Sequence, residues 1–208
     1  MFFYNDLKVL ALVFSTMSLG LFASEIEQGK ARFAACMVCH GPAGEGNASL
    51  MAPALAGQEP WYIKAQIHKF KNDQRGADYR DLTGMQMKGM AMSLRTDKDI
   101  DELLAYIKTF PKPPKKATLN GDPTKGKIAY ALCSSCHGPE AKGNPALKAP
   151  ALVNLPDWYI VAQLKKFNEG IRGVHPKDQE GQLMRTMAAT VPDEAARRDL
   201  AAYIISLE

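Results

Sequence analysis

The sequence has few aromatic residues, little net charge and few long hydrophobic runs, and each of these absences argues against a class of proteins. Aromatic residues make up only 8% of the 208 residues, and charge is nearly balanced, with 26 Lys and Arg against 22 Asp and Glu. The resulting net charge of +4 is too small to predict binding to nucleic acid, which needs strongly basic surfaces. Hydrophobic residues at 46% and charged residues at 23% exclude a collagen-like, coiled-coil or disordered chain and predict a globular protein.

Long hydrophobic runs are also scarce, and the longest one lies at the N-terminus. Val9–Phe22 is uncharged and mostly apolar, follows Lys8, and ends at the small residue Ala23. This pattern is typical of a secretory signal peptide, and it is shorter than the roughly 20 residues of a membrane-spanning helix. We therefore predict a signal peptide over residues 1–23 and export to the periplasm. Asp6 offsets Lys8, so an uncleaved amphiphilic anchor is the alternative.

The sequence repeats itself once. Residues 29–110 align with residues 126–207 without a gap, and 33 of the 82 aligned positions are identical. Identity at this level over 82 positions indicates duplication of one structural unit. We predict two homologous domains, over residues 24–110 and 121–208.

A short segment of different composition separates the two repeats. Residues 111–120, PKPPKKATLN, contain three prolines in the first four positions and almost no apolar side chain. Proline restricts the backbone and prevents a segment from joining a helix or a sheet. We interpret this segment as an extended connector, with a flexible tether as the alternative.

Each repeat has apolar residues at helical spacing and no alternating run long enough for a β-strand. Helices are expected over Glu27–Val38 and Pro60–Asn72, and again over Thr124–Ser135 and Pro156–Glu169. Thr96, followed by acidic residues, predicts the N-cap of a further helix. The predicted fold class is all-α. Because a domain of about 85 residues has a thin core, a large apolar cofactor held covalently would complete it.

The few cysteines are all found in two clusters of the form C-x-x-C-H, which is the pattern of c-type haem attachment. The clusters are Cys36, Cys39 and His40, and Cys133, Cys136 and His137. Two thiols on one turn of helix can both form thioethers to the haem vinyl groups, and the histidine then lies beneath the iron. A redox dithiol does not need the histidine, and a zinc site would need four thiolates from two complete domains to converge. We therefore predict two haem c groups.

The second axial ligand of each haem must come from elsewhere in each repeat. The other two histidines, His68 and His175, are not repeated, so each is interpreted as a surface residue. Two methionine positions are repeated, and a thioether ligand raises the reduction potential of haem iron. They are Met87 with Met184, and Met90 with Met187. Spacing alone does not separate these two pairs.

The chain resembles the dihaem cytochrome c4 family over residues 25–208. The resemblance lies in the twin C-x-x-C-H domains, each with an A-P-x-L segment, a W-Y pair, a Met-Arg-type loop and a final A-Y-I helix. The resemblance implies that the axial methionine directly precedes the basic residue of an M-[RK]-x loop. That residue is Met87 in the first repeat and Met184 in the second. Met90 and Met187 are then expected to pack in the core beside the haem.

The resemblance also implies a role for Pro53 and Pro150, whose carbonyls would accept a hydrogen bond from the proximal histidine and orient its ring. A rigid turn is the simpler interpretation of these prolines. Arg75 and Arg172 are repeated cations that could pair with haem propionates, because a guanidinium matches a carboxylate well. A solvated charge at a helix end is the alternative.

The resemblance implies an electron carrier and not an enzyme, with the two domains related by a pseudo-twofold axis and the haems near their interface. Single electrons would pass from a cytochrome bc1-type donor to a terminal oxidase, and any membrane association would be peripheral, through these partners. Lys112, Lys115 and Lys116 form one candidate docking patch.

The alternative function is a dihaem subunit of a larger oxidoreductase, such as a sulfide-oxidising flavocytochrome. A dihaem peroxidase needs an open or displaceable ligand position on the iron and acid–base residues beside it. The repeats contain no residues of this kind, so this function is disfavoured.

Overall fold

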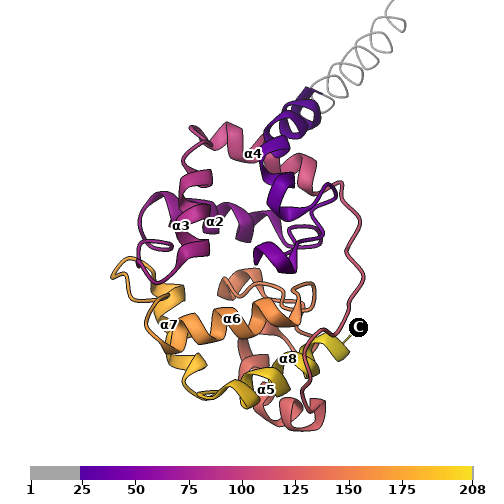
Figure 1. Cartoon of the computed structure of the whole chain (residues 1–208), viewed down its shortest axis with the longest axis vertical. Helices are drawn as coiled ribbons and strands as arrows, with labels where there is room; N and C mark the ends of the chain where they lie inside the picture. Colours follow the sequence, from indigo (N-terminus) through magenta and orange to yellow (C-terminus); the bar gives the residue numbers. More distant parts are fainter. Residues whose placement is uncertain (1–23, 208) are drawn as a thin grey trace, which may run out of the picture.

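The structure is a computed structural model that describes residues 24–207. The predicted signal peptide, residues 1–23, lies outside the described residues. The described part of the chain is helical and holds two isolated β-bridges but no strand, which confirms the all-α prediction. Two domains of similar shape stack on each other, with the first uppermost in Figure 1 and the second, in orange and yellow, below it.

The two domains contain the same elements in the same order. The first has a helix over residues 24–40, followed by η1 (Ala48–Leu50), α2 (Pro60–Lys71), α3 (Leu82–Ala91) and α4 (Asp97–Ile107). The second has α5 (Pro123–His137), η2 (Pro145–Leu147), α6 (Asp157–Asn168), α7 (Gln179–Ala188) and α8 (Glu194–Ser206). This agreement of elements is what the internal repeat predicts.

The helices expected from apolar periodicity are present, and each agrees with its expected range to within a few residues. Thr96 caps α4 as predicted, in a capping box in which Thr96 and Asp99 satisfy each other's backbone amides. The methionine segments, expected as loops, are instead the helices α3 and α7, so this expectation was wrong. Asp81 and Asp178 are the N-caps of these helices, and their side chains accept from the amides of Gly84 and Gly181.

Each domain is built around the crossing of its first and last helices. A β-carbon at Gly29 would lie 2.0 Å from the carbonyl oxygen of Glu102, and one at Gly126 would lie 1.9 Å from that of Asp199. Only glycine permits this close approach of two backbones. The repeated core residues are buried in both domains, and include Phe33 with Tyr130, Ile63 with Ile160, Leu103 with Leu200 and Ile107 with Ile204.

The connector runs along one side of the molecule without helix or strand (Figure 1, right). Near its end, the buried carboxylate of Asp157 accepts from the amide and hydroxyl of Thr118, both at 2.6 Å, and from the amide of Leu119 at 2.8 Å. Lys115 donates to the carbonyl of Leu207. These contacts hold the end of the connector against the second domain.

No helix within residues 24–207 is both long enough and apolar enough to cross a lipid bilayer.

Candidate haem sites

The histidine of each C-x-x-C-H cluster is buried and held in one orientation. His40 and His137 are each 5% exposed, and their Nδ1 atoms lie 2.7 and 2.8 Å from the carbonyl oxygens of Pro53 and Pro150. Because a carbonyl can only accept, Nδ1 carries the proton, and Nε2 keeps a free lone pair. Burial lowers the pKa of both imidazoles more than the hydrogen bond raises it. Burial therefore favours the neutral imidazole, the form that binds a metal, and the expected hydrogen bonds to the two proline carbonyls are present.

The four cysteines are free thiols at the edges of two cavities or next to them. Cys36 and Cys39 line the cavity of the first domain, and Cys133 lines that of the second. Burial raises the pKa of the Cys36 and Cys133 thiols. Within the described residues, no group of three or more His, Cys, Asp or Glu side chains is placed to hold a metal ion. The four thiols therefore do not converge on one site, as a zinc site would require.

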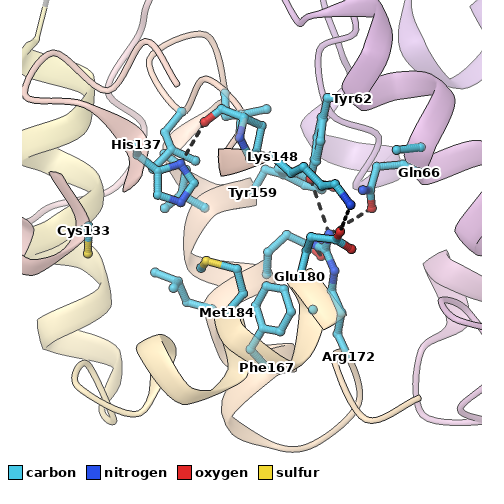
Figure 2. Close-up of a pocket in the computed structure, with 18 of the residues that line it drawn as sticks. Tyr62, Gln66, Cys133, His137, Lys148, Tyr159, Phe167, Arg172, Glu180 and Met184 are labelled. Carbon is cyan, nitrogen blue, oxygen red and sulfur yellow. Dashed lines mark hydrogen bonds and ion pairs between the residues drawn. The ribbon is translucent and has the colours of Figure 1, made fainter. Parts of the chain in front are cut away.

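A cavity of about 360 Å³ lies in the second domain, and a cavity of about 190 Å³ lies in the first. In the second domain, the side chain of Met184 lies across the cavity from His137, with Cys133 at the edge (Figure 2). Met87 and His40 both line the first cavity. Each cavity thus has an imidazole from the cysteine cluster and a thioether from α3 or α7.

The structure distinguishes the two repeated methionine pairs. Met87 and Met184 both line their cavities, whereas only Met90 of the other pair does so. Met90 lines the first cavity and is 39% exposed, and its packing beside the haem stays a prediction. Met187 is half-buried and outside the lining of the second cavity. This geometry favours Met87 and Met184 as the equivalent pair.

The two unrepeated histidines lie outside the linings of both cavities. His68 Nε2 is 3.4 Å from a carboxylate oxygen of Asp97, and His175 Nδ1 accepts from the amide of Lys177 at 3.2 Å. These contacts agree with their interpretation as surface residues.

The two cavities share one wall at the domain interface. Five side chains line both of them and come from α2, α6 and the segment before α6. They are Tyr62, Gln66, Leu155, Tyr159 and Gln163. A single layer of side chains therefore lies between the two sites.

Comparison with known proteins agrees with this arrangement. The family model "Cytochrome c" matches residues 26–111 and 123–208. The cytochrome c4 of Thiocapsa roseopersicina is 36% identical over 172 residues, covering 76% of this chain and 80% of the relative. The chain belongs to the cytochrome c4 family. As a member of this family, with two cytochrome c domains, it carries two covalently bound haem c groups and transfers electrons.

Solved structures share the fold. Reduced recombinant cytochrome c4 from Pseudomonas stutzeri superposes with a TM-score of 0.68 at 28% identity, covering 88% of this chain and 98% of that one. The thiosulfate dehydrogenase TsdBA from Marichromatium purpuratum gives a TM-score of 0.71 at 30% identity over 88% of this chain. This chain spans only 40% of the TsdBA chain. A "thiosulfate dehydrogenase electron acceptor" from Stutzerimonas stutzeri is 30% identical, covering 74% of this chain and 72% of the relative.

In this cytochrome c4 family member, the two repeated arginines are buried at the interface, so they are not solvated charges at helix ends. Arg75 donates to Gln66 of its own domain at 2.9 Å, and to Tyr159 and Gln163 of the other domain at 2.8 and 3.0 Å. Arg172 makes the reciprocal contacts with Gln163, Gln66 and Tyr62, at 2.8, 3.0 and 3.4 Å (Figure 2). Each guanidinium also lies 4.6 Å from the ring centre of a phenylalanine of its own domain, Phe70 or Phe167.

The surroundings of these arginines fit the anionic edge of a haem. Arg75 and Arg172 are 9% and 8% exposed, line the two cavities, and form no ion pair with any described residue. Arg75 Nε and Trp61 Nε1 are buried at the cavity walls without a hydrogen-bond partner. A buried cation without an anion is costly. The haem propionates would supply this charge, so the chain's thiols, imidazoles, thioethers and cations together fit two haem groups.

Proposed function

We propose that the chain is a periplasmic dihaem electron carrier in which each domain holds one haem between a histidine and a methionine. His40 and Met87 would be the axial ligands in the first domain, and His137 and Met184 those in the second. The thioethers would form at Cys36 and Cys39, and at Cys133 and Cys136. When bound, each haem supplies an iron that alternates between the ferric and ferrous states and so holds one electron.

The observation that carries this proposal is that a buried imidazole and a thioether line each of two cavities that share a wall. Pro53 and Pro150 fix the imidazoles with Nε2 facing away from the proline carbonyl, which increases their basicity as ligands. The thioethers of Met87 and Met184 are soft and neutral, so they favour ferrous iron and a high potential. Because only Tyr62, Gln66 and their neighbours separate the cavities, electrons have a short path between the two domains.

The remaining residues of the sites bind and shield the cofactor. Arg75 and Arg172 would pair with the propionates and so neutralise charge at the interface. The apolar residues of each cavity exclude water, which keeps the local dielectric low and the ligand bonds intact. The cytochrome c4 relatives support a role in electron transfer without chemistry on a substrate.

The proposed location and partners extend this role. The apolar segment before Ala23 supports export to the periplasm, and the cytochrome c4 relatives support a respiratory role. The donor would be a cytochrome bc1-type complex and the acceptor a terminal oxidase, with the protein meeting the membrane peripherally through them. Of the three connector lysines, Lys115 is bound to the carbonyl of Leu207, so the docking patch would depend on Lys112 and Lys116.

A second function is supported by the relative named "thiosulfate dehydrogenase electron acceptor" and by the resemblance to TsdBA. In this case the protein would accept electrons from a sulfur-oxidising enzyme, as in the alternative of a dihaem subunit in a larger oxidoreductase. Stopped-flow spectroscopy separates the two. Fast reduction by a thiosulfate-oxidising enzyme with thiosulfate supports the second function, and fast reduction by a bc1-type complex supports the first.

The ligand assignment is tested by methionine variants. Ferric iron bound to a thioether has a weak charge-transfer band in the red, to which both haems contribute. Met87→Ala and Met184→Ala should each remove one haem's share and lower the potential of that haem, because the replacement ligands favour ferric iron. Met90→Ala and Met187→Ala are matched controls that should keep the band. Loss of one haem's share of the band in Met90→Ala, together with an undiminished band in Met87→Ala, would show that the assignment is wrong.

A further inference from the structure

Two lysine–aspartate pairs cross the domain interface, and each ends at the helix that carries a proposed axial methionine. Lys166 on α6 contacts Asp81 Oδ1 at 2.5 Å, and Lys69 on α2 contacts Asp178 Oδ1 at the same distance. Lys69 aligns with Lys166 in the internal repeat, and Asp81 aligns with Asp178. Each domain therefore places an equivalent lysine on its partner domain.

The two aspartates are the N-caps of α3 and α7. The oxygen of Asp81 that binds Lys166 also accepts from the amide of Gly84 at 2.8 Å, and both aspartates are 2% exposed. A β-carbon at Gly84 would lie 2.2 Å from Asp81 Oδ2, so the carboxylate is seated directly on the glycine. A carboxylate here satisfies a free amide and is favoured by the helix dipole. One buried carboxylate thus joins the lysine of one domain to the start of the methionine helix of the other.

Few side chains of α3 and α7 are buried. Each is ten residues long, and the only buried residues are a glycine and an alanine, Gly84 and Ala91 in α3 and Gly181 and Ala188 in α7. A helix of this length is not stable by itself, so its position depends on its ends and on its contacts. Met87 lies six residues after Asp81, within two turns of the cap. A displaced cap would therefore displace the methionine.

The two pairs differ in their secondary contacts. Lys166 also donates to the hydroxyl of Thr83 at 2.8 Å, whereas Lys69 contacts a second carboxylate, Glu180, at 2.9 Å. Glu180 is paired in addition with Lys148, at 2.8 Å (Figure 2). Two lysines therefore contact carboxylates at the start of α7, whereas one lysine, Lys166, does so at the start of α3.

We propose that Lys166 and Lys69 are positioning residues for the axial methionine of the opposite domain, acting through the capping aspartates. The bond between iron and Met87 then depends on docking of the second domain, and the bond to Met184 on docking of the first. This coupling links the domain interface to the ligation of both haems. It rests on the proposed axial roles of Met87 and Met184.

The test is Lys166→Met in the oxidised, haem-loaded protein, titrated with imidazole. Imidazole competes with the thioether for iron, so the loss of the red charge-transfer band measures how firmly each methionine is held. We expect one haem's share of the band to be lost at about tenfold lower imidazole, which corresponds to about 1.4 kcal/mol, while the other share titrates as in the wild type. Asp81→Asn should reproduce this result, because asparagine keeps the cap but removes the charge.

Double variants assign the weakened haem. In Lys166→Met with Met184→Ala, the band that remains should titrate entirely at the lower imidazole concentration. In Lys166→Met with Met87→Ala, it should titrate as in Met87→Ala alone. The effect then belongs to the first domain although Lys166 belongs to the second, which a general loosening of the second domain would not produce.

Lys165→Met is the matched control, because Lys165 is adjacent on α6 and 59% exposed, and its one ion pair among the described residues is with Glu169. It should titrate as the wild type, and Lys166→Arg should restore most of the wild-type behaviour. The inference is overturned if Lys166→Met matches Lys165→Met, or if it weakens both haems equally or its own domain's haem. A band of undiminished intensity in Met87→Ala, in the otherwise unaltered chain, would instead refute the ligand assignment, and the inference would fail with it.

Discussion

The carboxylate of Glu59 in the first domain accepts a hydrogen bond, at 3.2 Å, from the backbone amide of Ala151 in the second. The side chain of Gln58 donates to the carbonyl of the same alanine at 3.1 Å. Ala151 follows Pro150, the residue that holds His137. The position equivalent to Glu59 in the second repeat is Pro156, so no such carboxylate faces the first haem site. The interface is therefore symmetrical in its arginines but not in its charge near the two histidines.

This asymmetry predicts that Glu59→Gln changes one potential only. Burial lowers the pKa of His137, and the charge of Glu59 opposes this effect, so the carboxylate acts at the second site. A negative charge favours ferric iron, and its removal should raise the potential of the second haem by on the order of tens of mV. Glutamine can still accept the bond from Ala151. A redox titration with unchanged potentials, or a shift in the first haem, would contradict this prediction.

Acid should weaken the interface through Glu180. Hydrogen bonds from Lys148 and Lys69 lower the pKa of this carboxyl from its ordinary value of 4.5 to about 2. As the pH falls, the carboxyl of Glu180 therefore takes up its proton at a higher pH in the unfolded chain than in the folded protein. The contribution of Glu180 to the free energy of unfolding is complete above about pH 4.5 and is lost as the pH falls towards 2.

Denaturant unfolding at a series of pH values measures this contribution. Glu180→Gln should lower stability above pH 4.5 and make its decline between pH 4.5 and 2 shallower, and Lys148→Met should do the same to a smaller extent. A pH dependence of Glu180→Gln identical to that of the wild type would show that the pairing contributes nothing.

The crossing of the first helix with α4 predicts opposite effects of two glycine substitutions. Gly29→Ala would place a methyl group 2.0 Å from the carbonyl oxygen of Glu102 and should destabilise the protein by about 1–3 kcal/mol. Gly89→Ala, in the exposed part of α3, meets no atom within 4 Å and should stabilise by about 0.5–1 kcal/mol. Chemical denaturation of the haem-loaded variants measures whether each substitution lowers or raises the free energy of unfolding. Equal effects of the two substitutions would contradict the close helix crossing.

Much of this fold could be predicted from the sequence because it depends on local patterns and on the repeat. The helices with an apolar stripe, such as α2, were located to within a few residues. The helices α3 and α7 were missed because they bury almost no apolar side chain. The sequence did hold a signal for the start of each helix, because each has a capping aspartate three residues before a glycine.

The interface was less predictable, because its contacts join residues that are far apart in the chain. Arg75 could be identified as a repeated cation, but its partners Tyr159 and Gln163 come from the other domain. The sequence did contain a signal for these contacts. Tyr62, Gln66, Lys69 and Asp81 are all identical in the second repeat, although none is part of the haem-attachment motif. Polar residues retained in both repeats need a shared role, and the structure indicates that this role is the interface.

The most direct test of the account is an optical redox titration of the wild-type protein that follows the haem absorption and the red band together. The proposed ligation predicts uptake of two electrons per chain, with the band lost in proportion at both steps because each ferric iron is bound to a methionine. Uptake of one electron, or a reduction step during which the band does not change, would contradict the proposal that each domain holds a haem between a histidine and a methionine.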